Sequence, residues 1–476
     1  MALITVCWGI NPGPYWLYQY ADFPWPKDLI KANDNVVSPD KATVQKYIQR
    51  YAERYGLLDK VDIRYGCYVK KITRDATRGI WIVSMDNKNR GEDGEAIMEA
   101  DVLLMCIGNN SSSPIIPNNI PGRELYHGTV LHSSEVGDGS ILNENAASTS
   151  TRNICIIGGS KSAYDIGQIH PNQTTIIMRT PHYWTPRWIV CLPFFDRLVG
   201  YMFRGYRVHT TDRSYLVRFL DWSMATTIAL GIHKPTKHSM LDDIMNGGGL
   251  HICTTHSEYI NAKNKWKVET SQPVSYTENG LKLENGKEIE ADVIVWGTGF
   301  APTRFFEEVF ESITLQNNLD DGLYLHKYVA HPSLPNCYFI GFRDPSLNVP
   351  TVASVQSLWA AMCVGGVVNL PSANEMRDIL ANRMQNTRHN FPYSHRRAYY
   401  DYFLQPPYND DYSYALDLIC DCKLENRVAS SSSSSSWCCN PMDIWTSSSA
   451  FRAVLGAQVV VEQDDDVRLS DSTRLL

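Results

Sequence analysis

Apolar and polar residues along the chain follow the period of a helix in some segments and of a strand in others. Apolar side chains recur at three- and four-residue spacing over residues 40–56, which predicts an amphipathic helix that ends at Gly56. The same spacing predicts helices over residues 353–368 and 373–404, and residues 180–250 read as a helical, aromatic-rich region. These helices lie between stretches whose pattern is that of strands.

Short apolar runs rich in β-branched residues mark the strands. Residues 68–73 and 79–84 predict two strands of a meander, and residues 101–108 predict a buried strand that ends in a glycine. Further strands are expected within residues 264–295 and over residues 336–341. Strands that alternate with helices in this way predict an α/β fold.

The most informative segment is a strand, a Gly-rich turn and a helix start near residue 158. An apolar run, Ile154-Cys-Ile-Ile157, leads into a turn where Gly158 permits a tight bend and small residues let a ligand approach the backbone. Such a turn can receive the pyrophosphate of a dinucleotide, because backbone N–H groups at the start of the helix face the anion. The predicted contacts are Gly158, Gly159, Ser160, Lys161, Ser162 and Ala163.

This motif departs from the usual Gly-x-Gly-x-x-Gly/Ala form, because Ser160 stands where the second glycine is expected. The Ser160 side chain narrows the approach of the pyrophosphate, and the charge of Lys161 can offset that loss. Arg179 follows the next apolar run, residues 174–178, where a cation can meet the 2′-phosphate that distinguishes NADP from NAD. An ordinary strand–helix turn with an exposed arginine is the alternative, but the spacing of turn, second strand and arginine favours NADPH.

Two strand-to-glycine runs resemble each other. Residues 101–108 and 292–300 each contain an aspartate, a buried apolar strand and a glycine, so they look like halves of one architecture. We therefore expect a three-layer α/β fold with two nested, Rossmann-like dinucleotide-binding domains. The expected units are a discontinuous domain at 1–150 and 276–425, an NADPH-binding domain at 151–275, and a disordered low-complexity tail at 426–476.

Composition excludes some classes of partner. The chain has 476 residues, of which 43% are hydrophobic and 20% charged, as in a soluble globular protein. A net charge of −7 argues against nucleic acid as the main partner, and no apolar stretch is long enough for an integral membrane segment. The start of the chain does not read as a signal peptide, and the twelve cysteines lack metal-ligand spacing. We therefore expect reduced thiols in a cytoplasmic protein without a metal site.

Six segments, taken together, resemble the flavin-containing monooxygenases, the FAD- and NADPH-dependent class B group. The resemblance covers residues 15–405, and the order and spacing of the segments make it specific. The segments are Tyr20-Ala-Asp-Phe-Pro24, Cys106-Ile-Gly108 with Pro114, Pro117 and Pro121, Tyr126-His-Gly-Thr-Val-Leu-His-Ser133, Arg179 with His182, Trp184 and Pro186, Trp296-Gly-Thr-Gly-Phe300, and Ser354-Val-Gln356 with Trp359.

The resemblance implies a monooxygenase that uses FAD, NADPH and O₂ to oxygenate a small, lipophilic substrate. In such enzymes the cofactor carries the chemistry, while the protein positions it and excludes water. The discontinuous domain is then the FAD-type domain, with contacts from Gly108, Gly299, Gln356 and the backbone near Val69. The similar Baeyer–Villiger monooxygenases carry Trp and then Pro or Asp after the signature histidine. This chain has Val136-Gly137 there, which favours heteroatom or carbon hydroxylation.

The resemblance assigns no catalytic acid or base. His132 is the one tempting candidate, and we expect it instead to satisfy a hydrogen bond in the connection between the two domains.

One feature of the family is missing from the sequence. The family opens with a strand and a Gly-x-Gly-x-x-Gly turn that holds the FAD pyrophosphate, followed by an acidic ribose contact, and the chain shows neither. We therefore expect the FAD-type domain to be truncated at its N-terminus and FAD binding to be weak. An alternative function follows, that of an NADP-binding pseudoenzyme or truncated product with little FAD binding and no turnover.

Overall fold

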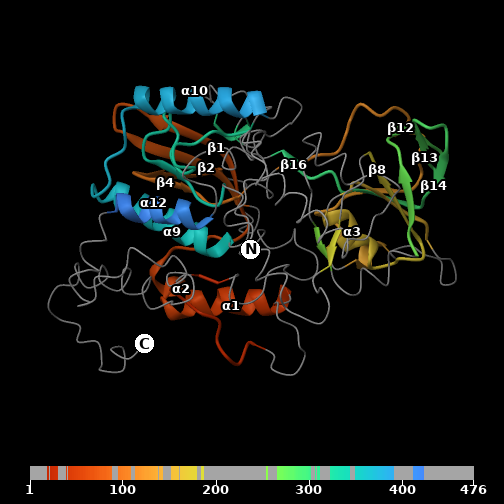
Figure 1. The fold of residues 1–476 in the computed structure, drawn as a ribbon, viewed down its shortest axis with the longest axis horizontal. Coiled ribbons are helices and arrows are strands. Elements are labelled where there is room, and N and C mark those ends of the chain that lie inside the picture. The colour runs from red at the N-terminus through yellow and green to blue at the C-terminus, as the bar shows by residue number, and fades with distance from the viewer. Residues whose placement is uncertain are drawn as a thin grey trace, which may run out of the picture.

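The computed structural model arranges its helices and strands in two groups that lie side by side (Figure 1). Both groups combine strands with helices, in agreement with the expected α/β fold. The residues that the structure describes are 19–20, 22–30, 39, 41–87, 95–108, 113–137, 139–142, 152–159, 161–179, 184–186, 253–255, 265–301, 306, 308–310, 322–342, 349–390 and 411–422.

A five-stranded parallel sheet is the centre of the first group. Its strands are β6 (Thr129–His132), β7 (Ile154–Ile157), β8 (Thr174–Met178), β11 (Lys267–Thr270) and β15 (Val293–Trp296). They lie in the order β11-β8-β7-β15-β6, and each neighbouring pair is parallel. The chain runs from β7 to β8 and β11 on one side, whereas β15 and β6 lie on the other. The strand order therefore reverses between β7 and β15.

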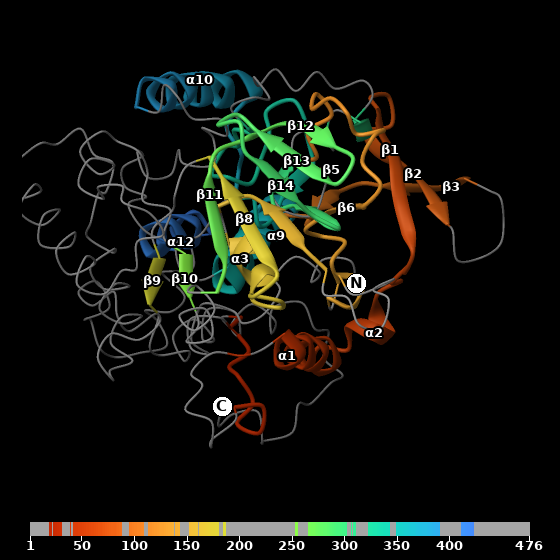
Figure 2. The same cartoon turned by 90° about the vertical axis from the view of Figure 1, so that its right-hand side faces the viewer.

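Alternating side chains of these strands fill a separate core on each face of the parallel sheet. Ile154 and Ile156 pack with Ala163 on one face, and Cys155 and Ile157 pack against a small antiparallel sheet on the other. A strand places successive side chains on opposite faces, so a continuous apolar run predicts burial on both. The covering elements are α3 (Lys161–Gly167) and the sheet of β12 (Pro273–Thr277), β13 (Gly280–Leu283) and β14 (Glu288–Glu290), shown in Figure 2. The first group thus has three layers.

The second group is built on a meander and a short parallel pair. The meander is an antiparallel sheet of β1 (Cys67–Asp75), β2 (Ile80–Asn87) and β3 (Glu95–Ala100). The pair consists of β4 (Leu103–Met105) and β17 (Cys337–Phe339), which are parallel. One hydrophobic cluster joins them, because Ile72 and Trp81 of the meander pack with Met105 and Phe339 of the pair.

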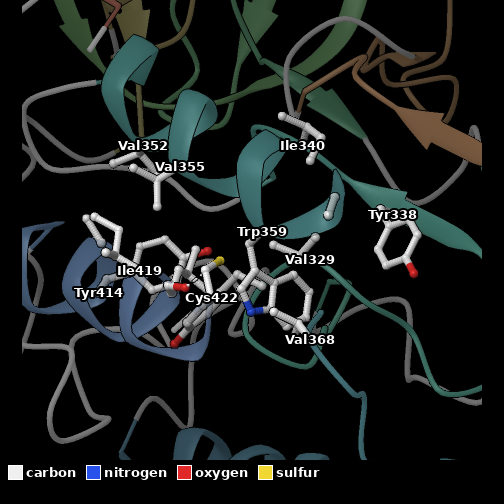
Figure 3. Packing of buried hydrophobic residues seen from close by; sticks show 14 of the residues in the cluster. Val329, Tyr338, Ile340, Val352, Val355, Trp359, Val368, Tyr414, Ile419 and Cys422 are labelled. Atoms are coloured by element: carbon white, nitrogen blue, oxygen red, sulfur yellow. Dashed lines mark hydrogen bonds between the residues drawn. The ribbon is translucent and has the colours of Figure 1, made fainter. Parts of the chain in front are cut away.

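Helices cover the β4–β17 pair. A buried cluster that includes Trp359 and Tyr414 lies between α9 (Val349–Val364) and α12 (Asp411–Asp421), as Figure 3 shows. The α10 helix (Ala373–Asn390) runs along the outside of this group in Figure 1. The remaining described helices are α1 (Lys41–Arg54) and α2 (Leu57–Lys60), with the short turn η3 (Ser140–Leu142).

A narrow antiparallel ribbon connects the two groups. It consists of two short strands, β5 (Ser113–Pro114) and β16 (Phe300–Ala301). β5 comes after Gly108 in the sequence, and β16 comes directly after Gly299. The Ile115 N–H donates to the Gly299 carbonyl at 2.9 Å and extends this pairing. A separate parallel pair is formed by β9 (Trp184–Pro186) and β10 (Cys253–Thr255).

Several predicted helices and strands are confirmed, although some of them begin or end at other residues than expected. The first helix ends before Gly56, which adopts a left-handed φ of 62°. The helix expected over 353–368 begins earlier, at Val349, because Pro350 is tolerated in a first helical turn. The same helix ends earlier too, before Gly366 with its φ of 71°. The sequence reading also missed β3, which completes the meander.

The parallel sheet takes strands from both sides of residues 151 and 275, the expected domain boundaries, which stay a prediction. β6 and β15, one from each segment assigned to the discontinuous domain, complete the parallel sheet around β7. A strand-to-glycine run identifies a strand and its end, but its neighbour in the sheet is decided by long-range packing. The tail at 426–476 and most of the region at 180–250 lie outside the described residues.

Candidate functional site

The turn after β7 lies at the point where the strand order of the parallel sheet reverses. In open α/β sheets, ligands bind outside the carboxyl ends of the strands at such a point. The Gly158 N–H donates to the Ile177 carbonyl of β8 at 2.9 Å, and the Gly297 N–H donates to the Ile157 carbonyl at 2.7 Å. These two bonds hold the start of the turn between the ends of β8 and β15.

Close packing leaves no room for a side chain at Gly158, where this turn begins. Gly158 has a φ of 141°, and a Cβ placed on it would lie 2.3 Å from the Gly297 carbonyl oxygen. A Cβ on Gly297 would lie 3.3 Å from the Cβ of Ala163 on α3. The first and last small residues of the dinucleotide motif have these two roles, the tight turn and close helix–strand packing. The residues present therefore fit a bound dinucleotide.

The structure brings most of the predicted NADPH contacts to this edge. Gly159 and Ser162 are half-buried, and Ala163 is fully buried. Lys161 is the first residue of α3, and Ser160 lies outside the described residues. Arg179 is exposed immediately after β8, at the same carboxyl edge as the turn, because β7 and β8 are parallel neighbours. Its guanidinium is available to an anion at that edge.

Two further glycines face each other at the carboxyl edge of the β4–β17 pair. Gly108 follows β4 with a φ of 65°, and Gly341 follows β17 with a φ of 79°. A Cβ on Gly108 would lie 3.9 Å from the Gly341 carbonyl oxygen, so this edge is open rather than closely packed. Gly341 was not predicted, although the strand-to-glycine pattern of residues 336–341 contained the signal.

Gln356 of α9 is brought to the same edge. Its side chain is fully buried, and its Oε1 accepts a hydrogen bond from the Gly341 N–H at 2.9 Å. The structure therefore brings together Gly108, Gly341 and Gln356 at one edge. The other two predicted contacts lie elsewhere: Val69 packs against the cluster of the meander, and Gly299 lies in the ribbon between the groups.

His132 is the clearest example of a residue that connects the groups. It is fully buried, and its Nε2 lies 3.0 Å from the Gly299 carbonyl oxygen, to which only a protonated nitrogen can donate. Its Nδ1 accepts from the Ser134 N–H at 3.2 Å. Burial lowers the pKa of His132, so the imidazole is neutral at pH 7 with its proton on Nε2. These contacts favour a structural role for His132 over a role in acid–base chemistry.

One buried hydroxyl beside His132 has no hydrogen-bond partner among the described residues. It is the Ser133 Oγ at the end of β6. Buried hydroxyls are usually paired, so this group is available to a ligand.

The described residues lack two other kinds of site. No cluster of His, Cys, Asp or Glu there could hold a metal ion. Likewise, none of the helices in that part of the chain has the length and apolar character needed to cross a membrane.

Comparison with known proteins identifies a family. The model of the family described as "Flavin-binding monooxygenase-like" matches residues 16–410. "Probable flavin-containing monooxygenase 1" of Arabidopsis thaliana is 24% identical over 440 residues, which cover 82% of this chain and 80% of that protein.

Solved structures show the same fold at lower identity. S-allyl-L-cysteine S-oxygenase from Allium sativum superposes with a TM-score of 0.54 at 16% identity, covering 96% of this chain and 81% of that one. Cyclohexanone monooxygenase from Rhodococcus sp. Phi1, bound to NADP⁺, superposes with a TM-score of 0.53 at 13% identity, covering 80% of each chain. Since the family model spans most of the sequence, the chain belongs to the flavin-binding monooxygenase-like family, whose members depend on FAD and NADPH.

Proposed function

We propose that this protein uses NADPH and O₂ to oxygenate a small, lipophilic substrate at a heteroatom or carbon. The observation that supports this most is the turn at Gly158, where the sheet order reverses and a Cβ would collide with the Gly297 carbonyl. A turn with these properties suits a nicotinamide dinucleotide. The use of a flavin is inferred from membership of the flavin-binding monooxygenase-like family.

Each group of residues has its own part in the proposal. The turn from Gly158 to Ala163 holds the pyrophosphate of NADPH, and Arg179 pairs with its 2′-phosphate. Gly108 and Gly341 present bare backbone to the flavin, and Gln356 holds Gly341 in place. Bound FAD would supply a hydride acceptor for NADPH and a centre that activates O₂, so that one oxygen atom would enter the substrate and the other would leave as water.

The chain's own residues bind and orient, and none is given an acid or base role. His132 joins the carboxyl end of β6 to the ribbon through the Gly299 carbonyl, which fixes how the two groups meet. A neutral, fully bonded imidazole neither takes up nor releases a proton during turnover. The catalytic contribution of the protein is then geometry and exclusion of water.

The test is to titrate the purified protein with FAD and with NADPH, and then to follow O₂ uptake. We expect flavin absorption bands after reconstitution, and NADPH-dependent O₂ consumption that increases with sulfur- or nitrogen-containing lipophilic compounds. Consumption of NADPH without any substrate-dependent oxygenated product would contradict the proposal.

A second candidate is an NADP-binding pseudoenzyme. The observation in its favour is that the described residues contain one Gly-rich strand–turn–helix, at β7–α3, and none beside the β4–β17 pair. Tight NADPH binding together with negligible FAD binding and no O₂ uptake would favour this candidate over the monooxygenase.

A further inference from the structure

We infer that Tyr414, on α12, is a positioning residue for the flavin-side edge and acts through Gln356. This inference rests on the proposed function, because it concerns the edge assigned to FAD. Tyr414 lies beyond residue 410, where the match to the family model ends, so the family motifs do not identify it. The structure nevertheless places its hydroxyl in the centre of the α9–α12 interface.

A directed chain of hydrogen bonds runs from Tyr414 to the glycine edge. The Tyr414 hydroxyl donates to the Lys327 carbonyl at 2.9 Å and accepts from Gln356 Nε2 at 2.9 Å. The other end of the same amide, Oε1, accepts from the Gly341 N–H at 2.9 Å. Gly341 in turn faces Gly108 across the edge. Two hydrogen bonds thus link one hydroxyl on α12 to the Gly341 backbone, a proposed flavin contact.

The direction of these bonds decides which way the amide points. A carboxamide has one acceptor end and one donor end, and only one orientation serves both Gly341 and Tyr414. Because the Tyr414 proton is used by the Lys327 carbonyl, its oxygen faces Gln356 as an acceptor and selects the Nε2 end. Among the described residues, the other partner of Nε2 is the Tyr328 carbonyl, which lies at 3.5 Å, the edge of hydrogen-bond range. Tyr414 therefore fixes the orientation that Gly341 needs.

The segment that receives the Tyr414 proton is itself held by α12. Lys327 and Tyr328 both have positive φ values, 49° and 58°, which non-glycine residues adopt only when their surroundings hold them there. The Lys327 ammonium lies 2.5 Å from Asp417 and 2.9 Å from Asp421, both on α12. Burial opposes the charge of Lys327, but these carboxylates outweigh it and raise its pKa. The acceptor of the Tyr414 proton is thus held in a defined position.

The competing explanation is that Tyr414 only packs α12 against α9. The same interface offers a control for that explanation. The Trp359 side chain is as deeply buried as Tyr414 in the cluster of Figure 3. Its indole N–H donates to Asp421 at 2.9 Å and not to Gln356. Changing Trp359 damages the interface without touching the amide.

The experiment compares Tyr414→Phe with Trp359→Phe in the full chain. The first readout is hydrogen exchange of the Gly341 amide, measured without any cofactor, and the second is the dissociation constant for FAD from flavin fluorescence. We expect Tyr414→Phe to accelerate Gly341 exchange and to raise the FAD dissociation constant, each about tenfold, since a buried donor loses its partner. Trp359→Phe should lower the melting temperature at least as much as Tyr414→Phe does. Its Gly341 exchange rate and its FAD dissociation constant should nevertheless stay within about twofold of those of the parent protein.

A double variant closes the test. In a Gln356→Leu background, Tyr414→Phe should change neither Gly341 exchange nor FAD affinity further, because the amide through which it acts is gone. Equal effects of Tyr414→Phe and Trp359→Phe on both readouts, or full additivity with Gln356→Leu, would overturn the inference. If the parent protein binds no FAD, the proposed function fails, whereas the exchange of the Gly341 amide still decides the role of Tyr414.

Discussion

The two glycine edges of this molecule are built in different ways. At the turn after β7, Gly158 packs closely against Gly297, the residue that follows β15, and the edge belongs to a five-stranded sheet covered on both faces. At the β4–β17 pair, Gly108 and Gly341 have open space, and their position depends on the side-chain bonds of Gln356 and Tyr414. The first edge is determined by close backbone packing and the second by a hydrogen-bond network.

Because they are built differently, the two edges should be sensitive to different kinds of substitution. A closely packed turn fails when any atom is added, because backbone cannot move aside. A network fails when a donor, an acceptor or a protonation state changes, because each member leaves another unpaired. Changes of each kind should therefore separate the two regions.

The largest effect is expected from Gly158→Ala. The new Cβ would meet the Gly297 carbonyl oxygen at 2.3 Å, and the φ of 141° is unfavourable for alanine as well. We expect the free energy of unfolding to fall by about 4 kcal/mol and NADPH binding to be lost. Urea denaturation and NADPH fluorescence measure the two quantities.

Gly286→Ala is the matched control for that change. Gly286 lies in the same group with a φ of 84° but has no atom within 4 Å of a built Cβ, so only the backbone term of about 1–2 kcal/mol applies. Similar losses for the two variants would mean that packing does not determine the turn after β7.

Acid should weaken the second group more than the first. His326 and His331 are buried there, and burial is the main reason that the pKa of each falls to about 4. Unfolding returns these pKa values to about 6.5, so the unfolded state binds more protons between pH 6.5 and 4. Their contribution is complete above pH 6.5 and decreases as the pH falls, by roughly 1 kcal/mol for each histidine at pH 5.5.

Hydrogen exchange at pH 7 and 5.5, corrected for intrinsic rates, measures this difference strand by strand. The amides of β17 should lose more protection than those of β7. Lys327 and Arg383 oppose the proton on His326, whereas Asp417 and Asp421 favour it, and Arg377 opposes the proton on His331. Equal loss of protection in both strands would show that the acid response is global.

Arg179→Ala tests whether the first edge distinguishes the two nicotinamide cofactors. A charged hydrogen bond to phosphate is worth about 1.5–3 kcal/mol, so NADPH binding should weaken at least tenfold. NADH lacks the 2′-phosphate, and its affinity should stay nearly unchanged. Arg64→Ala, an exposed arginine of the other group, should alter neither. Equal losses for both cofactors would remove Arg179 from this role.

The smallest effect is expected from Gly108→Ala. A Cβ finds space there, and only the φ of 65° is unfavourable, by about 1–2 kcal/mol. Asparagine tolerates this conformation better, so Gly108→Asn should recover part of the stability. Its larger side chain would nevertheless obstruct a ligand at the edge, and FAD affinity should fall below that of Gly108→Ala. If FAD affinity instead changes in parallel with stability in the two variants, Gly108 does not contact the flavin.

Local sequence patterns predicted much of the fold. They cover only a few neighbouring residues, which explains why features that depend on strand pairing were not predicted. The strand and turn at Ile154–Gly158 and the helix that ends before Gly56 follow from contacts within a few residues. Sheet order does not, because it depends on pairing between β7 and β15, which are far apart in the sequence. β3 was missed because its strength comes from pairing with β2, and its own sequence alternates weakly.

Residue type and short spacing were enough to predict the family, the tight turn at Gly158 and the glycines at two strand ends. Tertiary structure alone decided that β7 and β15 adjoin, that Gly297 closes on Gly158, and that a hydroxyl from α12 reaches Gln356. The physical reason is separation along the chain. Gln356 and Tyr414 are 58 positions apart, and no local preference of either residue specifies a bond across that distance.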